Sequence, residues 1–518
     1  MLLTILLLCC KLGNPYLAKN DFLIIEQKMI GRLRTLASET MIYGGFTIVG
    51  RFITFLLTPI YTNFLTMEEV GDVNWIFVTI AFLNIIYCFG MEAAFFRFYK
   101  KGNIEHNKMV FTHAYLMILG ISIIISSLSF SFAEDIAPLM TDLDYGVTLI
   151  RIASLIPLLD SMMTIPYALL RISNRPKRFA LTRFIVIVVA VALNMLFIVV
   201  LGWNAEGVFL ATFLANIVGV ASFIPEILKY MKFRFDKGML REMLYFGIPT
   251  IPASLSAMIL QMADRPILKY LTDSSTLGLY QVNHKLGIPM MLMVAVFDYA
   301  YKPFYLSHFE DEDAKPMFAR IMTYFTLVCA GIFLLTGFYM DFLIRMPFIG
   351  GKFINPDYWS GLGILPIILG GYFFNGIYNN LAAGFYITKT TKYLPIAVAA
   401  AAIVNILMNL LLIPEMSYWA SAWAMLVSYV ISAVILYFFA QKVYPIDFEW
   451  KRMSILISTT MAVYFAGYHI SNEFSLLMAF FIRTAFLLLL LVLLKLFGFF
   501  TGAEINRMKK FFGRKGEI

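Results

Sequence analysis

Charged residues are scarce in this sequence, and their scarcity indicates the class of protein. Asp, Glu, Lys and Arg make up only 14% of the 518 residues, whereas hydrophobic residues make up 60%. Soluble domains carry roughly 25% charged and about 45–50% apolar residues. A water-soluble fold of the present composition could not cover its surface with polar groups. The sequence therefore excludes a soluble globular protein and predicts an all-α protein whose solvent is the lipid bilayer.

Signals for chemistry are equally sparse. The four cysteines (Cys9, Cys10, Cys88, Cys329) include no CxxC pair and have no histidine at ligand spacing, so we expect neither a metal site nor a disulfide framework. The sequence contains no HExxH, no GxxxxGK and no GxGxxG in a strand context. Two Asp-x-Asp triplets, at 142–144 and 311–313, are interpreted as solvated loop acids. We predict no enzymatic activity, no catalytic residue and no cofactor.

Long apolar runs dominate the sequence instead. A transmembrane helix needs roughly 20 apolar residues, and about fourteen runs meet this requirement. No connection between them is long enough for an independent soluble domain. The predicted spans are 40–64, 73–98, 109–132, 146–170, 179–201, 207–230, 243–268, 277–301, 317–340, 358–386, 393–412, 419–440, 453–470 and 474–497.

The basic residues alternate with these spans in a way that predicts the topology. Cytoplasmic loops carry the Lys and Arg of a membrane protein. With the N-terminus inside, clusters such as 97–108, 171–183 and 229–241 lie inside, whereas the intervening segments carry acids such as Glu68, Glu69, Asp142 and Asp144. Both termini are therefore predicted to be cytoplasmic. The net charge of +9 is interpreted as topological, and no nucleic acid partner is expected.

A loose internal repeat indicates two similar halves. Tyr43–Gly71 resembles Tyr245–Gly278, and Ile156-Pro157 corresponds to Leu365-Pro366. Six spans per half is an even number, so the halves are expected to form two six-helix bundles related by a parallel pseudo-two-fold axis, followed by two extra helices. Seven prolines inside predicted spans are expected to kink them (Pro59, Pro157, Pro166, Pro249, Pro252, Pro289, Pro366).

The repeat and the spans together predict the domain boundaries. We expect an N-terminal cytoplasmic or unstructured segment at 1–37, bundles at 38–232 and 233–442, two extra C-terminal helices at 443–499 and a basic cytoplasmic tail at 500–518. The apolar stretch Met1–Cys10 is too short to span a bilayer, and Met29 looks like a more natural start than Met1.

Ionisable residues inside the spans are the candidate functional residues, because such groups cost roughly 2.5–3.5 kcal/mol to insert. We expect four to form a cationic, substrate-binding cleft (Arg51, Arg151, Arg265, Lys285). Four carboxylates are either ion-coupling or structural charges (Glu92, Asp160, Asp264, Asp298). Pairing of Glu92 with Arg97, and snorkelling of Asp264 with Arg265 at a span end, are the structural alternatives.

Several of these residues lie in motifs that resemble a known family. The run from Tyr43 through Arg51-Phe-Ile-Thr-Phe-Leu-Leu-Thr-Pro to Gly71, followed by Phe89-Gly-Met-Glu-Ala-Ala-Phe-Phe-Arg-Phe-Tyr99, is similar to the Wzx-type polysaccharide or O-antigen flippases. These form the oligosaccharidyl-lipid branch of the multidrug/oligosaccharidyl-lipid/polysaccharide exporter superfamily. Asp264-Arg265, Leu277-Gly-Leu-Tyr280 and Lys285 resemble the start of that family's second half.

The resemblance implies a function in polysaccharide biosynthesis. A flippase of this family would move a polyprenyl-pyrophosphate-linked oligosaccharide from the cytoplasmic to the periplasmic leaflet of a bacterial inner membrane, by alternating access and without a covalent step. A pyrophosphate cannot cross hydrocarbon unaided, and the four candidate cations would replace its water. Membrane lipids are implied as partners, together with H⁺ or Na⁺ and a polysaccharide polymerase or assembly protein as further candidates.

Three other functions stay open at this point. A cation-coupled multidrug exporter of the same superfamily would need an acidic cleft, whereas bases at least match acids here. A lipid II flippase of the same superfamily is the second alternative. A membrane glycan polymerase, the third, would be expected to carry a long periplasmic loop with catalytic groups, and the predicted outside loops are short.

Overall fold

The computed structural model describes residues 50, 53, 55–232, 236–500, 502 and 504. Helices make up nearly all of this part of the chain. The first half contains α3 (Thr58–Phe64), α4 (Met67–Cys88), α5 (Met91–Phe98), α6 (Ile104–Ser131), α7 (Ala133–Met140), α8 (Gly146–Ile172), α9 (Pro176–Asn194) with its π-helical continuation η1 (Met195–Val200), α10 (Ala205–Ser222) and α11 (Ile224–Tyr230).

The second half is also mostly helical. It contains α12 (Lys237–Gly247), α13 (Thr250–Met262), α14 (Asp264–Leu271), α15 (Ser274–Lys285), α16 (Ile288–His308), α17 (Ala314–Arg345), a hairpin of β1 (Pro347–Phe348) and β2 (Gly351–Lys352), the 3₁₀ helix η2 (Pro356–Ile364), α18 (Leu365–Ile387), α19 (Tyr393–Met416) and α20 (Tyr418–Val443). Two further helices, α21 (Trp450–Asn472) and α22 (Leu476–Leu496), follow.

The number of long apolar helices is lower than the predicted number of spans. Within the described residues eleven helices are long and apolar enough to cross a membrane, or up to twelve if the bent run Lys237–Ile259 and Asp264–Leu271 is one span. Most of the predicted span 40–64 lies outside the described residues. The predicted span 277–301 is divided at Leu286 and Gly287 into α15 and α16. The chain is thus an all-α multi-pass membrane protein, and the count of fourteen stays a prediction.

Several prolines of the predicted spans stand at the start of a helix rather than inside one. Pro59, Pro289 and Pro366 stand in the first turn of α3, α16 and α18. The first N–H groups of a helix have no acceptor within the helix, so a proline there costs no hydrogen bond. Pro157 and Pro166 lie inside α8, as expected for a kinked span. Three of these prolines therefore begin a helix and two lie inside one, and the expected kinks stay a prediction.

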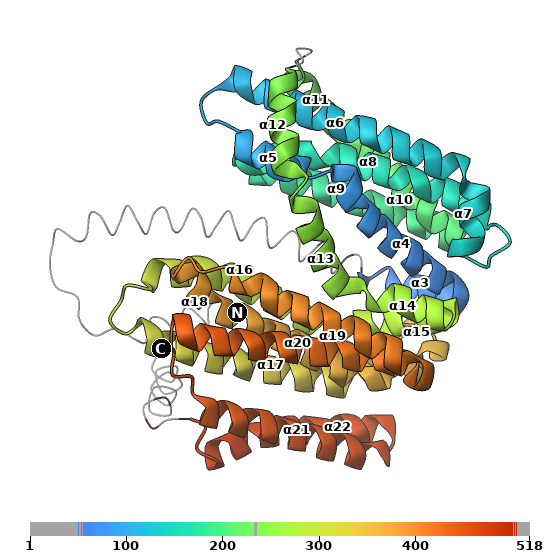
Figure 1. Cartoon of the computed structure of the whole chain (residues 1–518). Coiled ribbons are helices and arrows are strands. Elements are labelled where there is room, and N and C mark those ends of the chain that lie inside the picture. Colours follow the sequence, from blue (N-terminus) through green and yellow to red (C-terminus); the bar gives the residue numbers. More distant parts are fainter. Residues whose placement is uncertain are drawn as a thin grey trace, which may run out of the picture.

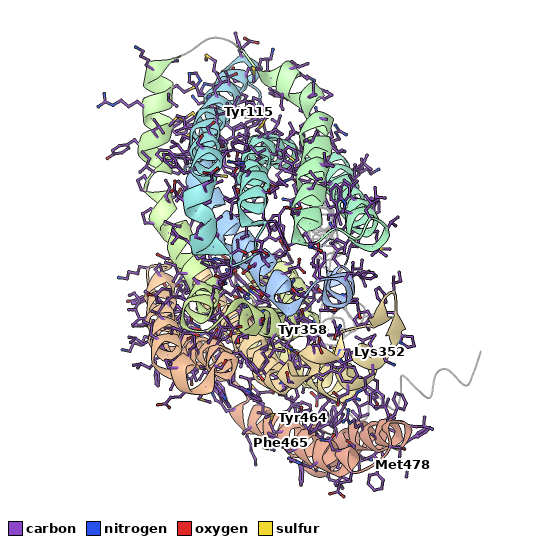
Figure 2. All side chains as sticks on the ribbon, turned by 90° about the vertical axis from the view of Figure 1, so that its right-hand side faces the viewer. Tyr115, Lys352, Tyr358, Tyr464, Phe465 and Met478 are labelled. Atoms are coloured by element: carbon purple, nitrogen blue, oxygen red, sulfur yellow. The ribbon has the colours of Figure 1, made fainter. Side chains whose placement is uncertain are left out.

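The helices form two bundles that meet at one end of the molecule and diverge toward the other (Figure 1). The meeting end carries α3, α14 and α15, and the loops predicted to lie outside the cell are at this end. Helix α12 packs against α5 and α6 of the first bundle. The next helix, α13, packs against α19 of the second bundle. Helices α21 and α22 rest on α17 at the outer edge of the second bundle, where Met478 marks α22 in Figure 2.

The apolar core reflects the same arrangement. One cluster, which includes Tyr115, belongs to the first bundle and to Met243 of α12, the helix that packs against it. A larger one contains Val70 of α4, Leu277 of α15 and Tyr358 of η2, so it continues through the place where the bundles meet. Tyr358 lies at this junction in Figure 2. The junction is therefore packed as a protein interior and is closed in this conformation.

Candidate functional site: the junction between the bundles

Helices α4 and α15 approach so closely at the junction that only glycine fits. A Cβ on Gly71 would lie 1.8 Å from the carbonyl oxygen of Ser274, and a Cβ on Gly278 would lie 2.5 Å from that of Met67. Both distances are far below van der Waals contact. The two glycines, one from each half of the sequence, therefore set the closed position of the bundles at this end.

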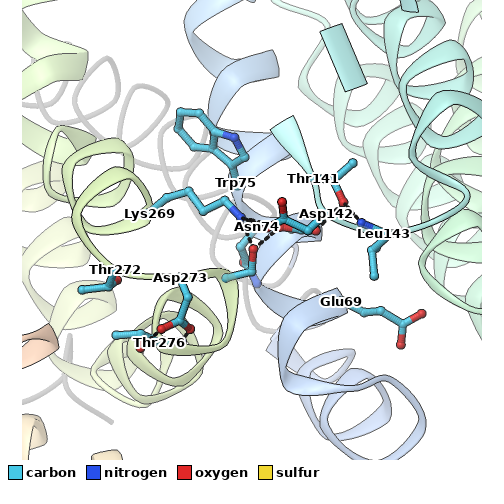
Figure 3. Close-up of polar contacts among 12 residues, drawn as sticks. Glu69, Asn74, Trp75, Thr141, Asp142, Leu143, Lys269, Thr272, Asp273 and Thr276 are labelled. Carbon is cyan, nitrogen blue, oxygen red and sulfur yellow. Dashed lines mark hydrogen bonds and ion pairs between the residues drawn. The ribbon is translucent and has the colours of Figure 1, made fainter. Parts of the chain in front are cut away.

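A buried carboxylate ties the same two helices together. Asp72 of α4 is fully buried, and the Nζ of Lys269 in α14 lies 3.2 Å from its Oδ1. The hydroxyls of Ser274 and Thr141 donate to the two oxygens of Asp72. Lys269 also lies 3.7 Å from Oδ2 of Asp142 (Figure 3). A buried carboxylate is retained only when such donors satisfy it, so this network depends on the two bundles being together.

A second acid supports the network from the side of the first bundle. Glu69 closes a capping box with Thr66 at the start of α4, which fixes the entry of the chain into this helix. The phenol of Tyr145, in the loop before α8, donates to Glu69. Burial, followed by the neighbouring Glu69 carboxylate, raises the pKa of Tyr145 above its usual value, so this tyrosine stays a donor.

The β1–β2 hairpin adds a third contact between the bundles. Nδ2 of Asn63 in α3 donates to the backbone oxygen of Lys352 at 2.6 Å. Gly350 has a φ of +84°, and a Cβ there would lie 2.6 Å from the ring of Phe64. The rings of Phe55 and Phe353 are 6.2 Å apart. The hairpin of the second half therefore rests on the first half.

Two of the predicted cations lie together in the second bundle. Arg265 is 7% exposed, donates to the backbone oxygen of Gln261 at 3.1 Å, and has a buried Nε without a partner within the described residues. Its charge acts on Lys285 and on His284. The neighbouring Asp264 accepts a hydrogen bond of 2.6 Å from the phenol of Tyr280. Arg265 thus retains donor capacity beside a second cation.

The other two predicted cations are not part of this group in the described chain. Arg151 forms an ion pair of 3.0 Å with Glu134, and 41% and 75% of their side chains are exposed. Arg51 lies outside the described residues. A common cleft of all four cations therefore stays a prediction.

The predicted carboxylates have different surroundings. Glu92 pairs with Arg171 of α8, so the alternative pairing with Arg97 is not the one the structure has. Asp298 pairs with Lys302 at 2.8 Å. Asp160 is bonded only to neutral amides, at 2.8 Å from Asn216 and 3.4 Å from Asn84. Asp264 and Asp160 are thus the two without an ion pair within the described residues.

Sequence reasoning missed Arg483, which lies inside the last predicted span. It is 2% exposed and donates to Ser471 at 2.8 Å, to the backbone oxygen of Phe338 at 2.6 Å and to Asp341 at 3.1 Å. Its position in an apolar run was the available signal. The contacts hold α22 to α17 and α21, so its role is structural.

An apolar cavity of about 510 Å³ lies between α17, α18, α20 and α21. Its walls are mostly aromatic and aliphatic and include Phe333, Phe373, Trp423 and Tyr464. Asp341, His469 and the phenol of Tyr468 are polar members of its lining. The cavity suits a hydrocarbon chain better than a polar molecule.

Comparisons with known proteins agree with this architecture. A family model described as polysaccharide biosynthesis protein matches residues 36–305, more than half of the chain. The fold is similar to that of the lipid II flippase MurJ in an inward closed conformation, with a TM-score of 0.67, 16% identity and coverage of 87% of this chain and 98% of that one. No curated protein sequence matches the chain.

Two further solved structures share the fold. An inward-facing multidrug resistance MATE family transporter of the MOP superfamily has a TM-score of 0.59 and 12% identity, and covers 78% of this chain and 94% of its own. A MOP superfamily transporter from Pyrococcus furiosus has a TM-score of 0.55 and 13% identity, with 79% and 95% covered. At such identities the likeness concerns the fold alone.

Proposed function

The chain belongs to the family of polysaccharide biosynthesis proteins. We therefore propose that it flips a polyprenyl-pyrophosphate-linked oligosaccharide from the cytoplasmic to the periplasmic leaflet of a bacterial inner membrane. The family match confirms the resemblance noted in the sequence. The chain is a membrane transporter of the flippase kind, which agrees with the expectation that it is not an enzyme. The cargo, the direction and the membrane are the proposed part.

The observation that carries the proposal is the closed junction between two bundles that diverge toward the other end (Figure 1). In the predicted topology the junction faces the periplasm, so the ends at which the bundles diverge face the cytoplasm. Alternating access then requires the junction to open as the opposite ends approach. Fourteen spans in two six-helix bundles, with both termini cytoplasmic, belong to the same proposal.

The charges support an anionic cargo. Arg265 and Lys285 would receive the pyrophosphate, whose water must be replaced by fixed donors inside a bilayer. The buried Nε of Arg265, which has no partner among the residues that the structure describes, is such a donor. Arg51 and Arg151 remain proposed members of the same cationic site. Asp264, beside Arg265, is proposed to hold the arginine side chain in place.

The apolar cavity supports a cargo with a lipid chain. A prenyl chain that enters between α17, α18 and α21 would stay in a hydrocarbon environment while its head group occupies the cations. Isoprenoid carbon buried there would contribute roughly 25 cal/mol per Å² of surface removed from water. A water-soluble cargo would not use this feature.

Transport in proteoliposomes tests the proposal. A fluorescent polyprenyl-pyrophosphate glycan is placed in both leaflets, and its access to a membrane-impermeant oxidant reports flipping. We expect Arg265→Gln and Lys285→Gln to lower the rate at least about tenfold, the loss of about 1.4 kcal/mol of interaction. Lys302→Gln is the matched control, because Lys302 is half exposed and paired with Asp298, and it should flip normally.

Competing cargoes complete the experiment. Lipid II and a cationic drug are offered to the same vesicles in place of the glycan lipid. Flipping of the drug alone would contradict the proposal, and faster flipping of lipid II would assign the protein to peptidoglycan precursors. Unchanged rates in both charge variants would remove the proposed role of the cations.

A further inference from the structure

The contact between α4 and α15 at the junction is reciprocal. Gly71 of α4 meets the backbone of Ser274, and Gly278 of α15 meets the backbone of Met67. The two residues of α15 each follow their counterparts in α4 by 207 positions (67 to 274 and 71 to 278). A two-fold axis through a contact produces such an exchange. We therefore expect the segments that follow α4 and α15 to be related by the same axis.

These segments end in two loops of equal length. Helix α5 follows α4, and residues 99–103 lead from α5 into α6. Helix α16 follows α15, and residues 309–313 lead from α16 into α17. Both loops lie at the end of the molecule where the bundles diverge (Figure 1). A movement that brings the diverging ends together therefore brings the two loops toward each other.

The two loops carry opposite charges. The basic loop, residues 97–103, contains three cations (Arg97, Lys100, Lys101). The acidic loop, residues 309–313, contains four carboxylates (Glu310, Asp311, Glu312, Asp313). All seven side chains are exposed. Loops of like charge would repel each other as the ends approach, whereas these two loops attract each other.

None of the seven side chains has an ion pair in this conformation within the described residues, because the charges nearby are engaged elsewhere. Glu105, at the start of α6, pairs with Lys108 and Lys232. The Nζ of Lys315, at the start of α17, lies 5.1 Å from the centroid of the Tyr444 ring. Four carboxylates in succession without a counter-charge repel one another. The acidic loop would therefore gain from a cationic partner that the diverged bundles do not supply.

We propose that the acidic loop pairs with the basic loop when the diverging ends meet, and that this ionic latch stabilises the conformation in which the junction is open. Exposed charges act over about 8 Å at physiological ionic strength. The latch thus has no effect while the loops are apart and acts once they are near. The buried pair of Asp72 and Lys269 holds one end of the bundles, and the latch holds the other.

The inference rests on the proposed function only in requiring that the bundles move, so its experiment needs no cargo. In a variant without native cysteines, spin labels replace Lys177, in the first turn of α9, and Lys392, just before α19; both residues are exposed. The distance distribution is measured in lipid nanodiscs at about 0.1 M and about 1 M salt, between which the Debye length falls from about 10 Å to about 3 Å.

We expect the ratio of short to long distances to fall at least about threefold at the higher salt concentration. The latch consists of exposed charges and is screened, whereas the ion pair at the junction is buried and is screened much less. This measurement uses the labelled parent alone, so it decides the outcome even where a charge variant does not accumulate.

Charge reversal identifies the two loops as the partners. Lys100→Glu with Lys101→Glu should lower the ratio at least about threefold at low salt, and so should Asp311→Lys with Glu312→Lys. The four changes together restore opposite charges and the net charge of the parent. The ratio should then return to that of the parent, which a change that acts on one loop alone would not produce.

Asp447→Lys with Glu473→Lys is the matched control. Both acids are exposed and lie outside the acidic loop, so this variant should keep the ratio of the parent. Three results would overturn the inference: a ratio that does not change with salt, an equally low ratio in the control, and a low ratio in the variant with all four reversals.

Two further outcomes separate this inference from its neighbours. A low ratio in the acidic-loop variant with a normal ratio in the basic-loop variant would also overturn the latch, and would assign the acidic loop to Mg²⁺ or to a basic cytoplasmic partner. A protein that follows every expectation for the latch but does not flip the glycan lipid would contradict the proposed cargo and leave the latch in place.

Discussion

At the scale of single residues, two arginines inside predicted spans have opposite environments. Arg483 is buried and bonded to two neighbouring helices, α17 and α21, whereas Arg151 is paired with Glu134 at an exposed position. Loss of one partner of a buried ion pair typically costs about 3–5 kcal/mol, and loss of an exposed pair about 0–1 kcal/mol. The difference predicts which arginine holds the fold together.

We therefore expect Arg483→Met to lower the thermal unfolding midpoint of the protein in detergent by several degrees, since Asp341 and the carbonyl of Phe338 lose their donor. Arg151→Met, a matched change, should leave the midpoint nearly unchanged. Equal midpoints for the two variants would show that the contacts of Arg483 contribute little to stability.

The sequence predicts that a charged residue inside a span is important, but it does not predict the contacts of that residue. A charge inside an apolar run signals importance, which is how Arg265, Lys285 and Asp160 became candidates. It does not reveal the partner, because the partner lies on another helix: Lys269 and Asp72 are 197 positions apart. For the same reason the closed junction, made of Gly71, Gly278 and Lys269, was not predicted, although acids near 68–72 were noted as loop charges.

At the scale of elements, the sequence predicts where helices lie more readily than where they break. All fourteen predicted runs that overlap the described residues contain helix, because an apolar run in a bilayer has few alternatives. The break between α4 and α5 was missed. There Phe89 and Gly90 have positive φ values, and a Cβ on Gly90 would lie 2.1 Å from the carbonyl oxygen of Gly247 in α12. This close contact with the other half leaves room only for a glycine at Gly90.

The β1–β2 hairpin is the element whose role is simplest to test. We expect its contact with α3 to exist only while the junction is closed, because Asn63 and Lys352 belong to different bundles. In a variant without native cysteines, Asn63→Cys with Lys352→Cys should form a disulfide that stops flipping, and a reductant should restore it. Gel mobility and the proteoliposome assay measure the two events.

Each single cysteine variant is the control, since it carries one thiol at the same place and should flip with or without the reductant. Full transport in the cross-linked double variant would mean that the hairpin and α3 stay together throughout the cycle. The junction would then have to open elsewhere.

At the scale of the whole molecule, movements at the two ends of the bundles should be coupled if each bundle is rigid: when the junction opens, the opposite ends approach each other. The continuous core across the junction supports rigid bodies, because packed interiors have alternative arrangements and do not deform gradually. A change that prevents closure at one end must then bring the opposite ends together. Local opening without rigid movement would leave the opposite ends where they are.

Gly71→Val separates these two cases. A side chain there meets the backbone of Ser274, so the closed junction cannot form, and we expect the distance between spin labels at positions 177 and 392 to shorten. Gly120→Val is the control, because a Cβ on Gly120 has no atom within 4 Å and its distance distribution should match that of the parent. An unchanged distance in Gly71→Val, measured on folded protein, would contradict rigid-body alternating access, since the junction would then open without any movement at the far ends.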